Sequence, residues 1–94
     1  AARSILRSFA EQTAGNCAEL ERALGEGDAA TVKTLAHKML PIFTMLGAAG
    51  IAATLRTAES WEGPLTDALR GEIGAAAENI RAIVAEAQKK VSLP

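Results

Sequence analysis

Residues 36–48 read AHKMLPIFTMLGA and hold the only histidine of the chain, His37. Apolar residues in and before this stretch recur at spacings of three and four, which is typical of an amphipathic helix. At about 100° per residue, one face of that helix collects Val32, Leu35, Ala36, Met39, Phe43 and Leu46. We expect this face to pack into a core.

His37 lies roughly 130° from the centre of the apolar face, so its imidazole should face solvent or a partner. The residues on the same outward side are Lys33, Leu40, Pro41, Thr44, Met45 and Ala48. Apart from the lysine and the threonine, these side chains are apolar. Apolar side chains gathered on a solvent-facing side indicate a docking surface.

Pro41 lies inside this predicted helix, four residues after His37. It removes the hydrogen bond that would end on the His37 carbonyl, and a proline in a helix interior costs about 3 kcal/mol against alanine. One interpretation is a kink that merely suits the packing. The other is a tolerated defect whose compact ring leaves His37 accessible. The sequence leaves both open.

The composition limits the possible functions. The chain has 94 residues, of which 49% are hydrophobic and 3% aromatic, and this balance favours one small helical domain. Its net charge of −1 is spread along the chain, without the basic stripe of a nucleic-acid-binding protein. No apolar run approaches the roughly 20 residues that span a bilayer. One cysteine, Cys17, and one histidine do not make a zinc site, and we expect Cys17 to be a core residue.

Four amphipathic helices are predicted. The first covers residues 4–24, the second begins after an N-cap at Asp28 and ends near Leu46, the third covers 48–61 and the fourth 65–91. Gly25 and Gly27 stop the first helix, and Gly47 stops the second. Short links between four such helices predict an all-α, antiparallel up-down-up-down four-helix bundle.

On the third helix, Ile51, Ala52, Leu55 and Ala58 should pack inward, whereas Arg56, Glu59 and Glu62 should face water. Gly47 and the small residues after it should let the second and third helices approach closely. That approach would give His37 a firm support.

The stretch AHKMLPIFTMLGA resembles the motif of histidine-containing phosphotransfer (HPt) domains. In that family, a histidine on the second helix of a four-helix bundle is followed by lysine at +3, a small residue at +4 and Leu-Gly at +9 and +10. Ala36-His37 and Leu46-Gly47-Ala48 match this pattern, whereas Leu40 stands at the lysine position and Pro41 at the glycine position. The variant is similar to a subgroup attached to hybrid sensor kinases of Bacteroides-like bacteria.

The resemblance implies a phosphocarrier rather than an enzyme. Nε2 of His37 would accept a phosphoryl group from a receiver-domain aspartate and pass it to another receiver. The receiver would supply the aspartate and the Mg²⁺, so this chain would hold no cofactor and no metal. The resemblance also implies a cytoplasmic monomer that contacts neither a membrane nor nucleic acid. The domain would belong to a larger hybrid sensor kinase.

Lys33, four residues before His37, shares its face and is our candidate for the auxiliary charge that steadies a phosphate. An ordinary solvated lysine is the alternative. Thr44 is a second candidate, for a hydrogen bond, although a plain surface hydroxyl explains it more simply. Leu40, Pro41, Met45 and Ala48 are expected to dock the receiver.

The departures at Leu40 and Pro41 motivate a different function. In this alternative, the chain is a four-helix docking module that binds receiver domains without being phosphorylated. A plain bundle with an incidental histidine explains neither the apolar patch nor the Leu46-Gly47 step.

Overall fold

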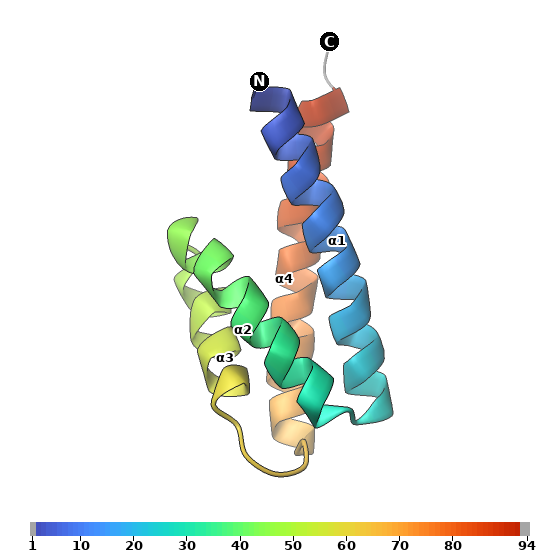
Figure 1. Cartoon of the computed structure of the whole chain (residues 1–94), viewed down its shortest axis with the longest axis vertical. Coiled ribbons are helices and arrows are strands. Elements are labelled where there is room, and N and C mark those ends of the chain that lie inside the picture. Colours follow the sequence, from blue (N-terminus) through green and yellow to red (C-terminus); the bar gives the residue numbers. More distant parts are fainter. Residues whose placement is uncertain (1, 93–94) are drawn as a thin grey trace.

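A computed structural model describes residues 2–92 of the chain, with side chains described from residue 4 to residue 91. Its four helices are α1 (Ala2–Glu26), α2 (Ala29–Met45), α3 (Ala49–Glu59) and α4 (Asp67–Ser92). Each helix packs on the next around a ring, and α1 and α4 close that ring (Figure 1). The predicted all-α four-helix bundle is therefore confirmed.

The apolar stripes of all four helices meet in one core. The largest fully buried apolar side chains are Phe43, Leu20, Met39, Leu55, Ile73, Ile80 and Val32. Burying an aliphatic or phenyl side chain of this size contributes about 1.5–3 kcal/mol of stabilisation. The expected inward stripe of α3, including Ala52, is also buried.

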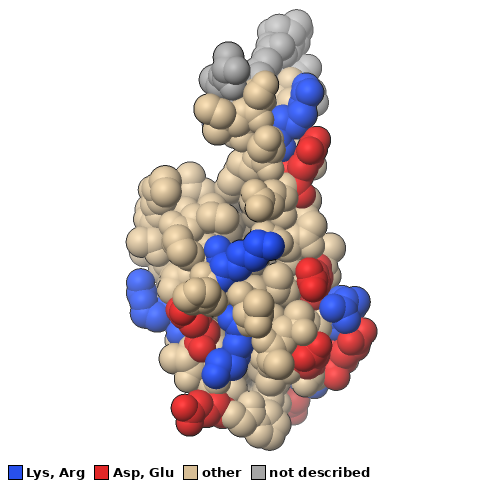
Figure 2. Space-filling model, viewed as in Figure 1, with Lys and Arg blue, Asp and Glu red and all other residues tan. Residues whose placement is uncertain are grey.

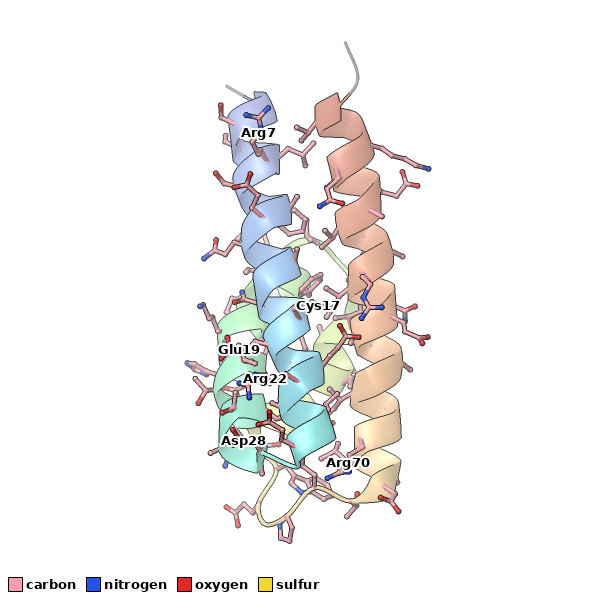
Figure 3. The ribbon with its side chains drawn as sticks, turned by 90° about the vertical axis from the view of Figure 1, so that its right-hand side faces the viewer. Arg7, Cys17, Glu19, Arg22, Asp28 and Arg70 are labelled. Carbon is pink, nitrogen blue, oxygen red and sulfur yellow. The ribbon has the colours of Figure 1, made fainter. Side chains whose placement is uncertain are left out.

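Cys17 packs between α1 and α4, as expected of a core residue (Figure 3). Its thiol donates to the carbonyl of Ala77 at 3.4 Å, and burial raises its pKa. A buried thiol of raised pKa is a poor nucleophile. On the surface beside it, an ion pair between Arg81 and Glu21 also links these two helices.

The helices differ in length, and this sets the shape of the molecule. α1 and α4 have 25 and 26 residues, whereas α2 and α3 have 17 and 11. At about 1.5 Å per residue, α1 and α4 therefore extend well beyond the other pair. Figure 1 shows them projecting together at the end that carries both termini. The molecule measures 47 × 23 × 18 Å.

Two glycines end helices in the same way. Gly27 and Gly47 have φ of 70° and 73°, a conformation that costs glycine little. After α2, Gly47 N–H donates to Thr44 O at 3.1 Å and Ala48 N–H to Phe43 O at 3.0 Å. These two bonds form a Schellman motif. It satisfies the last carbonyls of α2 and turns the chain directly into α3.

Asp28 caps the start of α2, as predicted. Its carboxylate accepts from the Thr31 hydroxyl at 2.6 Å and from the Thr31 backbone N–H at 3.2 Å. These bonds stabilise the ionised form and lower the pKa of Asp28. The cap fixes the position at which α2 begins.

Several helix ends differ from the predicted ones. α1 is longer than predicted at both ends. Its C-terminal end lies later because Gly25 stays within the helix and Gly27 ends it. α3 stops at Glu59, and Trp61 lies in the following loop with its indole N–H on the Pro64 carbonyl at 3.1 Å. α4 begins at Asp67 rather than at residue 65, because the Thr66 hydroxyl accepts from Leu69 N–H at 3.1 Å and so acts as its N-cap.

The placement of Leu46 in the core was wrong. The side chain is 55% exposed. Leu46 follows the last residue of α2 and is its C-cap, at the level where α2 ends and α1 and α4 continue alone. It therefore lies at the edge of the core. Over the described part of the chain, none of the helices combines the length and apolar character that a bilayer crossing requires.

The core predicts one contrast in stability. Phe43→Ala should lower the free energy of unfolding by about 3–5 kcal/mol, because it removes a fully buried ring and leaves a cavity. Met45→Ala, two residues away but 86% exposed, should change it by less than about 0.5 kcal/mol. Urea denaturation followed by circular dichroism measures both. Equal effects would contradict this assignment of the core face.

Candidate functional site

His37 projects from the outer side of α2. Its side chain is 77% exposed, whereas the adjacent Ala36 is fully buried. The helical wheel predicted this orientation. The imidazole is therefore accessible to another molecule.

Glu59, in the last turn of α3, forms a hydrogen-bonded pair with His37 through Oε1 and the ring Nδ1. The Glu59 side chain is only 31% exposed. The sequence placed this residue among those that face water, and its side chain does stay partly exposed on the outer side of α3. The sequence did not predict that its carboxylate reaches across to α2 and holds the imidazole.

The pairing follows from the geometry of the α2–α3 turn. His37 and Glu59 are each eleven residues from Ala48, the residue that follows Gly47 in the turn. In two antiparallel helices, residues equally distant from a tight turn lie at the same level. A short connection closed by a Schellman motif therefore brings these two side chains together.

Lys33 and Thr34 join this pair. Together with His37 and Glu59 they line a shallow hollow of about 370 Å³ on the outer side of α2 and α3. The structure thus brings the predicted auxiliary lysine into the neighbourhood of the histidine, one helical turn before it. Lys33 and Glu59 give the hollow one positive and one negative charge.

Thr44 and Ala48 lie further along, beside a second hollow of about 240 Å³ that Arg56 also lines. Thr44 is two helical turns from His37, so at about 1.5 Å per residue the two backbones are separated by roughly 10 Å. Thr44 shares the outward side of α2 with His37, but it lines a different hollow. Gly47 lies at the edge of this second hollow.

The remaining predicted docking residues form an uncharged surface. Pro41 and Met45 are exposed, whereas Leu40 and Ala48 are half-buried and pack against the core. From residue 39 to residue 55 the sequence contains no Asp, Glu, Lys or Arg. Figure 2 shows this as a continuous uncharged area over the ends of α2 and α3 that are joined by their turn. Pro41 is accommodated within α2.

The His37–Glu59 pair defines the chemistry available at the ring. An ionised carboxylate only accepts hydrogen bonds, so Nδ1 must carry the hydrogen that it donates. In the neutral ring, Nε2 then has the free lone pair. The site therefore offers an oriented nitrogen nucleophile.

Glu59 is the site residue that the sequence did not reveal. Its separation of 22 residues from His37 matches no local motif. The pairing could have been predicted only from the register of the antiparallel helices α2 and α3. That register could not be assigned without the exact position of the turn between them. Within residues 2–92, no group of three or more His, Cys, Asp or Glu side chains is arranged to hold a metal ion.

Comparison with known proteins returned no matching family model, no matching curated protein and no matching solved structure.

The pair predicts a tautomer that can be measured. In the neutral ring, ¹⁵N NMR should find His37 mainly as the Nδ1–H form, because Glu59 accepts from Nδ1. In Glu59→Ala the Nε2–H form should become substantially populated. Glu62→Ala removes an exposed carboxylate from the loop after α3 and serves as the matched control. An unchanged tautomer ratio in Glu59→Ala would contradict the role of the carboxylate.

Proposed function

We propose that this chain is a phosphocarrier of the HPt type, in which His37 takes a phosphoryl group from a receiver-domain aspartate and passes it to another receiver. The observation that supports this most directly is the exposed imidazole of His37, whose Nδ1 is held by Glu59 while Nε2 is left for a partner. Its position on the second helix of a four-helix bundle, before a Leu46-Gly47 step, agrees with the HPt motif.

In the proposed transfer, the Nε2 lone pair attacks the phosphorus of an aspartyl phosphate. The N–P bond forms as the bond from phosphorus to the aspartate oxygen breaks, and the aspartate leaves as a carboxylate. The ring keeps its proton on Nδ1 and becomes positively charged. Glu59 offsets this charge, and reversal of the same steps returns the group to a second receiver.

The other site residues have roles that follow from their positions. Lys33 lies in the same hollow as His37, so its ammonium would offset part of the charge of the phosphoryl oxygens. Pro41 and Met45 are exposed near the histidine and would contact the receiver, with Leu40 and Ala48 beneath them. The receiver would bring the Mg²⁺, and this chain would add no cofactor.

Transfer of label tests the proposal. A receiver carrying ³²P on its aspartate is mixed with this chain, and we expect label on the chain that is labile in acid and stable in alkali. His37→Gln should lose the label completely while keeping its circular dichroism spectrum, because the side chain is exposed. Binding of the receiver by the unmutated chain without any label would instead support the docking module suggested by Leu40 and Pro41.

Substitution of Lys33 should slow phosphotransfer without abolishing it. Lys33→Ala should shorten the lifetime of the phosphohistidine, or slow its formation, by about two- to fivefold, since an exposed charge contributes only modestly. Lys38→Ala is the matched control, because Lys38 is also exposed and lies next to His37 but points about 100° away. Equal kinetics for the two variants would remove Lys33 from the site.

A further inference from the structure

An apolar hollow of about 780 Å³ lies away from His37, where α1 and α4 extend past the end of α2. Ile5, Leu6 and Phe9 form its α1 wall, and Leu46 lines it from the end of α2. Ile5 is 73% exposed, which is unusual for a large aliphatic side chain on a folded chain. The hollow is therefore an uncovered apolar surface rather than part of the core.

The α4 wall carries both apolar and charged residues. Ile83 and Ala87 continue the apolar surface, and Glu86 and Lys90 stand at its edge. The two charges have opposite signs and lie one helical turn apart. Glu86 Oε1 also lies 3.9 Å from Lys89 Nζ of the same helix, and an exposed ion pair at this distance contributes little.

The reason for the exposure lies in the lengths of the helices. In the lower part of the bundle, α2 and α3 cover the apolar stripes of α1 and α4. Near the termini α1 and α4 continue as a pair, and Figure 1 shows no further helix over them. At that level the described part of the chain contains only α1 and α4. The apolar sides that α2 and α3 cover lower in the bundle are therefore left open.

We propose that this hollow is the contact surface of a homodimer, in which the projecting ends of α1 and α4 from two copies pack together across a two-fold axis. Each copy would supply the two helices that the other lacks, and the intermolecular layer would repeat the packing of the lower bundle. This proposal is independent of the proposed phosphocarrier function, and it replaces the expectation of a monomer.

The charges at the edge favour a second copy over a different partner. A two-fold interface must be complementary to itself. Glu86 of one copy would face Lys90 of the other when the two α4 helices run antiparallel, and the symmetry would produce this pair twice. An acidic or basic partner would find only one of the two charges matched.

His37 would stay accessible in the proposed dimer. Leu46 follows His37 by nine residues and so lies about 180° away around α2. The proposed contact therefore covers the side of α2 opposite the imidazole. A receiver and a second copy would have separate surfaces.

Sedimentation equilibrium of the 94-residue chain, from about 1 μM to about 1 mM, tests the proposal. We expect a reversible shift from the monomer mass to the dimer mass as concentration rises. A monomer mass over the whole range would overturn the proposal. So would a dimer that survives unchanged in the variants described next, because it would use another surface.

Charge exchange tests the pairing itself. Glu86→Lys and Lys90→Glu should each weaken dimerisation on the order of tenfold, because each replaces two attractive pairs with two repulsive ones. Both residues are exposed, so the variants should fold. An equimolar mixture of the two variants should form a heterodimer about as stable as the wild-type dimer. Failure of the mixture to associate would overturn the proposed pairing.

A pair of substitutions separates this surface from the phosphotransfer site. Ile5→Glu places a charge in the hollow and should abolish the dimer while leaving transfer of label to His37 unchanged, because Ile5 lies on α1 and has no part in the proposed phosphotransfer site. Met45→Glu is the matched control, because Met45 is more exposed and does not line the hollow. It should leave the dimer intact and weaken receiver binding. A dimer lost equally in both variants would overturn the assignment to this hollow.

Discussion

The turn at Gly47 is the constraint on which the site depends. Its left-handed conformation and the two bonds of the Schellman motif end α2 and begin α3 within three residues. A turn this short leaves little freedom in the register between the helices. Because the register is fixed, a glutamate 22 residues away meets Nδ1 of His37, and the single histidine has a defined orientation. A longer connection would keep the four helices and lose this pair.

The two sides of α2 have different surroundings because of its position in the bundle. One side faces outward with α3 and carries His37 in a polar hollow with Lys33 and Glu59. The opposite side packs into the core and against α1, and it is buried until α2 ends at Met45. Leu46 follows directly and is left at the edge of an apolar hollow. The length of α2 thus decides which apolar residues are core and which remain exposed.

The helical periodicity was sufficient to predict the bundle, the outward direction of His37 and the burial of Cys17 and Phe43. These features depend on the angle around one helix, which spacing determines directly. Leu46 was placed wrongly, and the contact of Glu59 with His37 was missed, for a different reason. The position of each depends on where a neighbouring helix ends or how two helices are aligned. The start of α4 shows the same limit, since the sequence predicted residue 65, whereas the bond from Leu69 N–H to the Thr66 hydroxyl makes Asp67 the first residue.

The charges near His37 bear on how long the proposed phosphoryl group would stay bound. A phosphoryl group would bring roughly two negative charges to a hollow that holds one lysine and one carboxylate. Glu59 would stabilise the positively charged ring at Nδ1, yet it would also repel the phosphoryl oxygens at Nε2. The uncharged surface from residue 39 to residue 55 adds no second cation on the adjoining stretch of α2. A site built for permanent binding would need more positive charge. In the proposed phosphocarrier, this balance of charge would favour release of the phosphoryl group to a second receiver.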